Sequence, residues 1–369
     1  MLRPADPSDR LRAIYRIRCD GADGIAARAQ AIAVEQSIEM PLAAVDDDRI
    51  RREVVGRVEA ITPAGAGTFE VVIGLAVETV GGDAGQLLNM LFGNSSLHED
   101  VVLADVEFPA ALVREFGGPR HGIAGLRRRS NVSARALTCT ALKPQGLPPE
   151  RLAQLAVRFA QGGIDYIKDD HGLADQDSAP FVVRLAAITG ALRSAGCAAR
   201  YVPSLSGDLD AVRRQLAAAI EAGVDTAMVA PMIMGFANFQ RLVREHPGVA
   251  FLAHPAMAGA ARIAPPLLIG KLFRLIGADA VIFPNHGGRF GYSAETCRAL
   301  ADAARGEWDT LQPSVPVPAG GMSTTRVREM LDFYGTEVML LIGGALLEAG
   351  ERLPAATTAF VAEVANYSG

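Results

Sequence analysis

Eight short apolar segments follow one another after Arg135, and stretches of helical character separate them. The stretch 149–159 repeats apolar residues at helical spacing, and 208–223 opens on a capping aspartate and ends in glycine. Eight strand–helix units in about 230 residues match the (β/α)8 count, whereas a doubly wound sheet rarely uses so many regular units. The sequence therefore predicts an α/β fold of the TIM-barrel type. The predicted strands are 137–143, 164–170, 201–207, 226–231, 251–256, 280–285, 317–321 and 338–344.

The earlier part of the chain predicts a smaller domain of α+β, ferredoxin-like type. A chain of 369 residues is long enough for two domains. We place the small domain at 1–125 and the barrel at 126–369. The small domain is expected to contain a strand at 12–19, a helix at 24–36, a hairpin of 54–61 with 68–76, a helix at 85–92 and a strand at 101–108.

Composition excludes several classes of function. The formal charge is −5, and the one basic run, 127–129, is too short for a nucleic-acid surface. The four cysteines are far apart and form no CxxC pattern, which is typical of a reducing compartment. The N-terminus lacks the apolar core of a signal peptide, and no apolar run approaches the roughly 18 residues that cross a bilayer. We expect a cytoplasmic protein with no nucleic-acid or membrane partner.

Lysine is nearly absent from the chain, and its positions are informative. Only three lysines stand against 33 arginines, and Lys143 and Lys168 end the first and second predicted strands. Arginine replaces lysine as a charge, but it supplies no amine that loses its proton near neutral pH or reacts with a carbonyl or CO2. Because barrel enzymes keep their active site at the carboxyl ends of the strands, these two lysines predict amine chemistry there. Lys271 lies in a helical stretch and carries no such expectation.

The segment LysAspAspHis (168–171) predicts a site for a divalent metal. Alternation along a strand puts Lys168 and Asp170 on one side, and His171 follows as the chain turns over the barrel mouth. Carboxylate oxygens and an imidazole converging there can hold a divalent cation, Mg2+ by preference where carboxylates dominate. The alternative is a structural lysine in salt bridges with the neighbouring acids.

Other strand ends supply further candidates. Lys143 is either a proton shuttle near the metal or a cation that binds a phosphate or oxyanion of the substrate. His254, at the end of the fifth strand, is either catalytic or structural. His286 lies in a glycine-rich loop and is expected either to contact the substrate or to cover it. The pairs Gly320–Gly321 and Gly343–Gly344 end strands seven and eight, where barrels commonly bind phosphate through backbone N–H groups.

The same residues carry a family resemblance that extends over essentially the whole chain. GlyGlyIleAspTyrIleLysAspAsp (162–170) and AlaLeuLysPro (141–144) are similar to the metal-site and first-strand lysine motifs of the ribulose-bisphosphate carboxylase large-subunit superfamily. Within it, the chain resembles the RuBisCO-like (form IV) branch. Further motifs in the family's order are GluGlnSer (35–37), PheGlyAsn (92–94), GlyProArgHisGlyIle (118–123), AlaGlyGly (319–321) and IleGlyGly (342–344).

The resemblance implies a cofactor and an assembly. Lys168 would carry CO2 as a carbamate and so become a carboxylate-like ligand of Mg2+, with Asp170 as the second protein ligand. Proteins of this type pair as homodimers. Glu35 and Asn94 from the small domain of one subunit would reach the barrel mouth of its partner.

The departures from the family pattern bear on the reaction. His171 stands in place of the second acidic metal ligand, so the identity of the metal stays open. Gln145 replaces a cation of the first-strand motif, Pro255 replaces an arginine, and Ala319 replaces a phosphate-binding serine. The loop 285–292 contains no lysine to position CO2. We therefore expect an enzyme that does not fix carbon and that binds a sugar with one phosphate.

Three form IV chemistries compete, and all pass through an enediolate. We favour an isomerase of 5-methylthioribulose 1-phosphate, with Lys143 or His254 as base, because the predicted barrel mouth is rich in methionine and poor in charge. A decarboxylase of 3-oxo-isoapionate 4-phosphate would need a cation for the departing carboxylate, for which Arg289 is the candidate. The 2,3-diketo-5-methylthiopentyl-1-phosphate enolase uses a lysine where this chain has Asn94.

Two alternative functions do not depend on the family resemblance. A Schiff-base aldolase also places a lysine at the end of a barrel strand, but borohydride would trap its imine, whereas a carbamylated lysine forms none. A non-catalytic binding protein is the other rival. It is disfavoured because both lysines persist in a chain that otherwise uses arginine.

Overall fold

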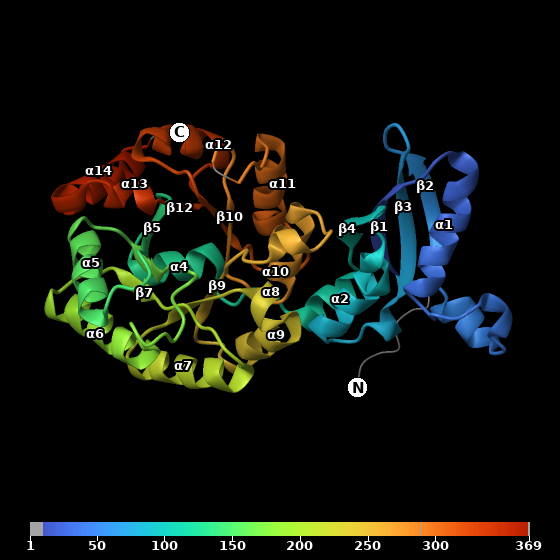
Figure 1. Cartoon of the computed structure of the whole chain (residues 1–369), viewed down its shortest axis with the longest axis horizontal. Coiled ribbons are helices and arrows are strands. Elements are labelled where there is room, and N and C mark those ends of the chain that lie inside the picture. The colour runs from blue at the N-terminus through green and yellow to red at the C-terminus, as the bar shows by residue number, and fades with distance from the viewer. Residues whose placement is uncertain (1–9, 289, 368–369) are drawn as a thin grey trace. The chain divides into compact units, whose positions relative to one another are not determined.

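The computed structural model describes residues 10–288 and 290–367, and internal contacts divide the chain into two compact units (Figure 1). The first unit is 1–117 with 257–268 and 309–311, and the second is 118–256 with 269–308 and 312–369.

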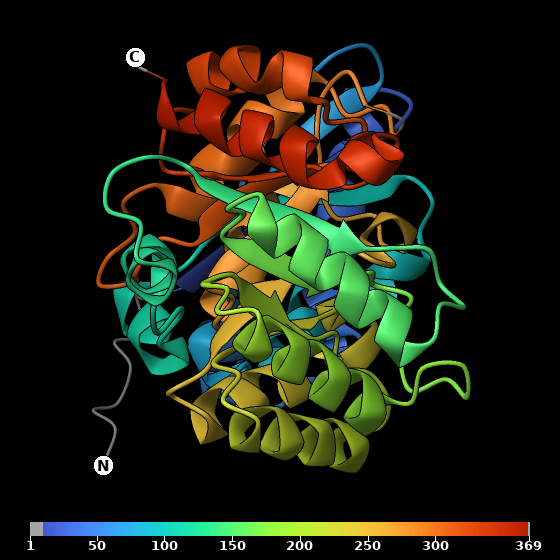
Figure 2. The same ribbon diagram turned by 90° about the vertical axis from the view of Figure 1, so that its left-hand side faces the viewer.

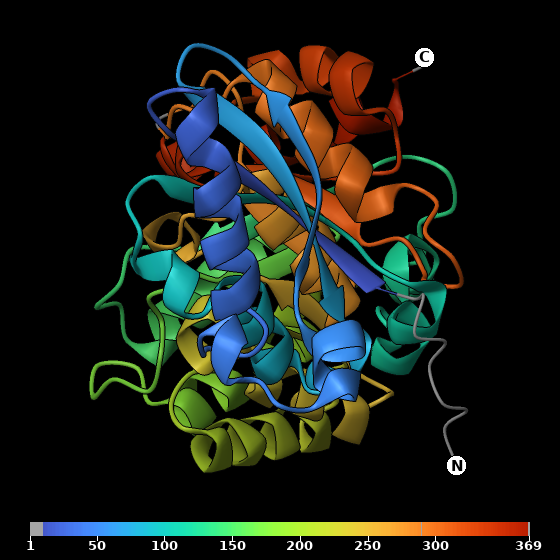
Figure 3. The ribbon, with the colours of Figure 1, turned by 90° about the vertical axis from the view of Figure 1, so that its right-hand side faces the viewer.

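The first unit is built on a four-stranded antiparallel sheet in the order β2-β3-β1-β4. Buried residues of β1 alternate with exposed ones, so one face of the sheet forms the core of the unit, and α1 packs along the sheet (Figure 3). The strands are β1 (Arg10–Arg18), β2 (Arg57–Pro63), β3 (Thr68–Ala76) and β4 (Val101–Glu107). The helices are α1 (Ala22–Glu35), α2 (Ala84–Phe92) and α3 (Ala110–Phe116).

The predicted hairpin is present, but its first strand begins later than expected. Residues Ile50–Val54 form a short π-helix instead of extending β2. The guanidinium of Arg10 donates to the carbonyls of Glu53 (2.6 Å) and Val55 (3.0 Å), which holds this turn against β1. A buried arginine that satisfies backbone carbonyls therefore decides the start of the strand.

A segment from far along the chain joins this small sheet. The amide of Leu103 in β4 donates to the carbonyl of Arg262 (3.0 Å), and the amide of Ala264 donates to the carbonyl of Leu103 (2.9 Å). These bonds make a short parallel bridge between Leu103 and Ile263. The first unit therefore contains a piece of chain that follows the fifth barrel strand.

The second unit is a barrel of eight parallel strands, as the sequence predicts. Two four-stranded sheets, in the orders β12-β5-β6-β7 and β11-β10-β9-β8, meet at a parallel bridge between Ser204 and Met228 and at the contact of β11 with β12. The strands are β5 (Leu137–Leu142), β6 (Tyr166–Asp169), β7 (Arg200–Val202), β8 (Thr226–Val229), β9 (Ala250–Ala253), β10 (Ala280–Pro284), β11 (Val315–Ala319) and β12 (Met339–Leu341).

Helices follow the barrel strands, and α5, α6 and α7 lie side by side on its outside (Figure 2). The side chain of Asp208 caps α7 by accepting from the amide of Ala211 at 2.7 Å, as the capping aspartate predicts. No helix in the described ranges is long and apolar enough to cross a membrane. The helices of this unit are α4 (Gly122–Ser130), α5 (Pro149–Gln161), α6 (Phe181–Ser194), α7 (Leu209–Glu221), α8 (Pro231–Met234), α9 (Phe236–Glu245), α10 (Phe273–Leu275), α11 (Ala294–Arg305), α12 (Val327–Tyr334), α13 (Gly344–Leu347) and α14 (Leu353–Ala365).

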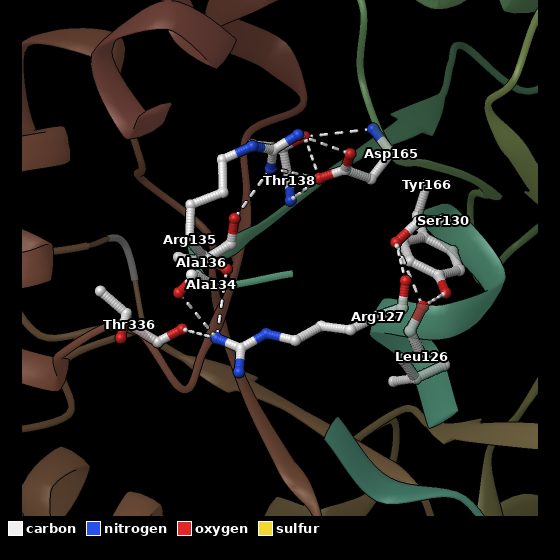
Figure 4. Close-up of polar contacts among 10 residues, drawn as sticks. All are labelled: Leu126, Arg127, Ser130, Ala134, Arg135, Ala136, Thr138, Asp165, Tyr166 and Thr336. Carbon is white, nitrogen blue, oxygen red and sulfur yellow. Dashed lines mark hydrogen bonds and ion pairs between the residues drawn. The ribbon is translucent and has the colours of Figure 1, made fainter. Parts of the chain in front are cut away.

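Polar contacts tie together the amino ends of the first two barrel strands (Figure 4). Asp165, just before β6, accepts a bidentate pair from Arg135 (2.7 and 2.8 Å) and further bonds from the amide and hydroxyl of Thr138 (both 2.8 Å). The hydroxyl of Tyr166 donates to the carbonyl of Leu126 in α4 at 2.6 Å. These bonds satisfy buried polar groups at the end of the barrel opposite the predicted site.

The interior of the barrel is filled by every second residue of its strands. The buried cluster includes Leu137 and Cys139 of β5, Tyr166 of β6, and Ala250 and Leu252 of β9. Since side chains of a strand alternate between its faces, the next inward positions are fixed by counting in steps of two. That count determines which residues can reach the barrel mouth.

Candidate active site

Continuing each inward series by steps of two leads to the residues that the sequence singles out. The series through Cys139 reaches Lys143, the series through Tyr166 reaches Lys168 and Asp170, and the series through Leu252 reaches His254. The structure brings these side chains together at the carboxyl ends of β5, β6 and β9, which is the face that barrel enzymes use.

Lys168 is a buried amine, with 3% of its surface exposed. Its ammonium donates to the backbone carbonyl of Asp169 at 2.9 Å. Burial lowers the pKa of Lys168 below its ordinary value, because the charged form is deprived of water, and the nearby charge of Lys143 lowers it further. A larger share of this side chain is therefore the neutral amine, which is the form that reacts with CO2 or a carbonyl.

Asp170 lies between two potential hydrogen-bond donors. Its Oδ1 is 2.9 Å from Nζ of Lys143 and 3.4 Å from Nδ1 of His171. Burial alone would raise the pKa of Asp170, but the hydrogen bonds from His171 and Lys143 and the charges of Lys143 and Lys168 outweigh it and hold the pKa well below the usual range. Asp170 is therefore a carboxylate at any physiological pH.

His254 packs flat against His171, with ring centroids 4.5 Å apart and planes 6° from parallel. Its Nδ1 accepts a hydrogen bond from the amide of Ala256 at 3.1 Å. Burial, followed by the positive charge of Lys168, lowers the pKa of His254 to about 2. The ring is therefore neutral, and because Nδ1 is an acceptor, its single proton sits on Nε2.

A buried network behind the site escaped the sequence reasoning. The carboxylate of Asp169, which points away from Asp170, accepts from the hydroxyl of Tyr201 (2.8 Å), the amide of Ser204 (3.1 Å) and Nε of Arg184 (3.2 Å). The sequence did contain one signal of this network. Arg184 lies on the apolar face of α6, where arginine is found only when it is paired.

The glycine pairs differ in what surrounds them. Gly320 and Gly321 have φ values of +76° and +75°, which residues with a side chain rarely adopt. A Cβ placed on Gly343 would lie 4.0 Å from Cε of Lys143, so this glycine borders the amine cluster, whereas a Cβ on Gly344 would meet nothing within 4 Å. Both pairs end strands of the barrel, at the same end as the lysines.

The loop after β10 packs against the pair Gly320–Gly321. A Cβ on Gly288 would come within 2.3 Å of the carbonyl oxygen of Gly320, so only glycine fits there. The ring of His286 lies 4.6 Å from that of Phe333, and its Nε2 is buried without a hydrogen-bond partner in the part of the chain that the structure describes. The predicted substrate cation, Arg289, lies outside the described residues.

Glu35 and Asn94 belong to the first unit and are in contact there. Nδ2 of Asn94 donates to Oε1 of Glu35 at 2.8 Å and to Oε1 of Glu39 at 3.1 Å. Glu35 and Asn94 were predicted as site residues from the family resemblance. The sequence gave no sign of Glu39.

The chain matches a known family. The segment 122–349 matches the catalytic domain of the ribulose bisphosphate carboxylase large chain. The chain belongs to the RuBisCO large-chain family. A Rhodospirillum rubrum protein named 5-methylthioribulose-1-phosphate isomerase is 58% identical over 364 residues, which cover 97% of each chain.

Two further proteins of the RuBisCO family are similar to this chain, one more and one less closely. The crystal structure of a Rubisco-like protein from Rhodopseudomonas palustris has a TM-score of 0.91 and 50% identity, and covers 98% of this chain and 99% of its own. A 2,3-diketo-5-methylthiopentyl-1-phosphate enolase from Geobacillus kaustophilus is 32% identical and covers 74% of this chain and 70% of its own. The resemblance stated from the motifs is thereby confirmed.

Proposed function

We propose that this RuBisCO-like protein is a Mg2+-dependent isomerase of a monophosphorylated ketose, 5-methylthioribulose 1-phosphate, which acts through an enediolate without fixing CO2. The observation that carries the proposal is a buried amine, Lys168, beside the ion pair of Lys143 with Asp170 at the mouth of the barrel. The relative that is 58% identical and named for this isomerase supports the choice of substrate.

The donor groups present fit a divalent cation once Lys168 is carbamylated. Among residues 10–288 and 290–367, no three His, Cys, Asp or Glu side chains alone could hold a metal. Asp170 and His171 supply an oxygen and a nitrogen donor, and a carbamate on Lys168 would add carboxylate-like oxygens of the kind that Mg2+ prefers. When bound, the cation would polarise the ketone of the substrate and compete with Lys143 for Asp170.

Lys143 is the better candidate for the base. As the free amine, released from its ion pair with Asp170, its Nζ would take the proton from the carbon next to the ketone and then deliver a proton to another carbon. His254 is less suited to this step, because the proton of its neutral ring sits on Nε2 and Nδ1 accepts from the amide of Ala256. We assign His254 the complementary role of donating from Nε2 to the oxygen that gains charge in the enediolate.

The remaining predicted residues would bind the rest of the substrate. The backbone amides of Gly320, Gly321, Gly343 and Gly344 would hold its single phosphate, and His286 would border it. We further propose that the protein is a homodimer in which Glu35 and Asn94 of each small domain complete the barrel site of the partner.

Deuterium incorporation tests the proposal. The purified protein would be incubated in D2O with Mg2+, bicarbonate and, in turn, 5-methylthioribulose 1-phosphate and the sugar phosphates of the decarboxylase and enolase reactions. We expect NMR to show an isomerised product carrying deuterium from the first substrate only. Loss of CO2 from a branched oxo-acid, or enolisation of the diketone, would overturn the choice of reaction.

Two lysine variants make the assay specific. Lys143→Met removes the proposed base and is expected to lower the exchange rate by roughly 10²–10⁴-fold. Lys271→Met alters the one other lysine of the chain, outside the site, and serves as the matched control. Full exchange in Lys143→Met would exclude Lys143 as the base.

A further inference from the structure

We propose that Glu39 is a positioning residue, which together with Glu35 turns Asn94 so that its carbonyl oxygen, and not its amino group, is presented to the substrate. The inference rests on the proposed function for the identity of the substrate. The orientation of Asn94 itself is a property of the first unit alone, where all three residues lie.

The two ends of the Asn94 amide have different surroundings. Its Nδ2 carries two hydrogens, and two carboxylate oxygens accept from it, Oε1 of Glu35 at 2.8 Å and Oε1 of Glu39 at 3.1 Å. A carboxylate accepts but does not donate, so the opposite orientation of the amide would set oxygen against oxygen twice. Within the described residues Oδ1 of Asn94 has no hydrogen-bond partner, so it is the end left to a ligand.

The backbone of Glu39 indicates that its side chain is needed where it is. Glu39 has φ of +51°, in the left-handed region that glycine and asparagine adopt readily and glutamate rarely does. Its amide donates to the carbonyl of Val34 at 3.0 Å, which bends the chain back after α1 and brings the carboxylate beside Asn94. Glycine would make the same turn with less strain, so the turn alone does not explain a glutamate.

A buried glutamine fixes the other side of the cluster. Gln36 is 3% exposed, and its Nε2 donates to the carbonyls of Asn89 (3.2 Å) and Met90 (2.8 Å) at the end of α2. Its Oε1 accepts from the amide of Ser95 at 3.1 Å. The end of α1 and the residue after Asn94 are therefore held together, so that Glu35, Glu39 and Asn94 keep their relative positions.

The charge of the Glu35 and Glu39 carboxylates strengthens the preference of Asn94 for a ligand group that donates a hydrogen bond. Hydrogen bonds to ionised acceptors polarise an amide and make its oxygen a stronger acceptor. Asn94 would therefore bind a hydroxyl of the sugar phosphate, which is a donor, and would disfavour a second phosphate or carboxylate at that point. Glu39 acts through Asn94 and sets the strength and direction of that contact.

The orientation can be measured without substrate. The chain has six asparagines, so labelling only asparagine with 15N leaves few side-chain amide pairs in the NMR spectrum, and Asn94→Asp identifies one of them. We expect Glu39→Gly to shift one of the two Asn94 side-chain protons toward the position of a solvent-exposed amide. No shift of either proton would overturn the bond to Glu39.

Kinetics then tests the role in binding. Glu39→Gly should lower kcat/KM for the sugar phosphate by roughly tenfold, mainly through KM, because it weakens a contact made before and during the reaction. Glu39→Gln keeps an uncharged acceptor and should lose less. The Tm of Glu39→Gly should equal or exceed that of the wild type, since glycine relieves the backbone.

The control and the contrary outcomes separate the two hypotheses. Asn131→Gly replaces another residue of positive φ, +56° at the end of α4, and should leave the kinetics unchanged. Wild-type KM in Glu39→Gly would overturn the positioning role, as would a lowered Tm with no kinetic change. If the wild type converts no candidate sugar phosphate, the proposed function fails, and the NMR shift still decides the role of Glu39.

Discussion

Replacement of Arg184 by methionine should destabilise the barrel far more than loss of a surface arginine. Arg184 and Asp169 are both fully buried, with Nε 3.2 Å from Oδ2. The same guanidinium donates to the carbonyls of Ala179 (2.5 Å) and Ala174 (2.9 Å) in the loop after β6. Methionine fills a similar volume but leaves a carboxylate without its counter-charge and two carbonyls without their donor.

The expected loss is about 3–5 kcal/mol, the usual effect of removing one partner from a buried ion pair. For a unit of this size it corresponds to a fall in Tm of roughly 6–20 °C. The loss should be smaller at low pH. Burial already raises the pKa of Asp169, and without Arg184 it rises further. A carboxyl whose folded pKa exceeds its unfolded value binds its proton more tightly when folded, so the variant regains stability as the pH falls toward that raised pKa.

Differential scanning calorimetry at two pH values measures both effects, and Arg184→Met combined with Asp169→Asn removes the orphaned charge. We expect the double variant to recover a large part of the loss. Arg213→Met, which breaks an exposed pair with Glu245 (2.6 Å), is the matched control and should leave the Tm nearly unchanged. The reasoning is refuted if Arg184→Met loses no more than the control, or if the double variant is no more stable than the single one.

Three further predictions follow from the same structure. Lys168→Arg keeps a positive charge but forms no carbamate, so deuterium exchange and its dependence on bicarbonate should disappear in the NMR assay. Gly288→Ala should lower the Tm and raise KM, because the new Cβ would lie 2.3 Å from the backbone oxygen of Gly320; Gly190→Ala in α6, where a Cβ meets nothing within 4 Å, should raise the Tm slightly. Burial raises the pKa of Cys139 to about 12, so this thiol should stay unmodified by an alkylating reagent from pH 7 to 9 in the native protein and react after unfolding.

Much of the fold could be predicted from the sequence, because hydrophobic periodicity carries it. Apolar runs of strand length alternate with helical patterns, and the inward series of each strand extends to the residues at its end. The convergence of Lys143, Lys168 and His254 at one end of the barrel could therefore be predicted from pattern and position. The boundaries of β2 were not, because the buried guanidinium of Arg10 competes for carbonyls that a strand would otherwise have used.

The parts of the site that escaped prediction depend on contacts between residues distant in the sequence. The orientation of Asp169 away from Asp170 follows from the alternation of side chains along the strand. Its partners Arg184 and Tyr201, however, come from two other elements. Glu39 meets Asn94 across 55 residues of chain and through a left-handed backbone, and neither leaves a local pattern. Such partners become visible only when the tertiary structure is known.

The small parallel bridge between Leu103 and Ile263 limits how these two units could have been exchanged in evolution or in the laboratory. The segment 257–268 begins three residues after His254, yet it belongs to the compact unit built mainly from 1–117. A gene cut between 117 and 118 would strip β4 of this neighbour and leave the apolar side chain of Ile263 without its cover. Replacement of the small unit by a foreign one would have to exchange 257–268 together with 1–117, so the two units are expected to be inherited as one piece.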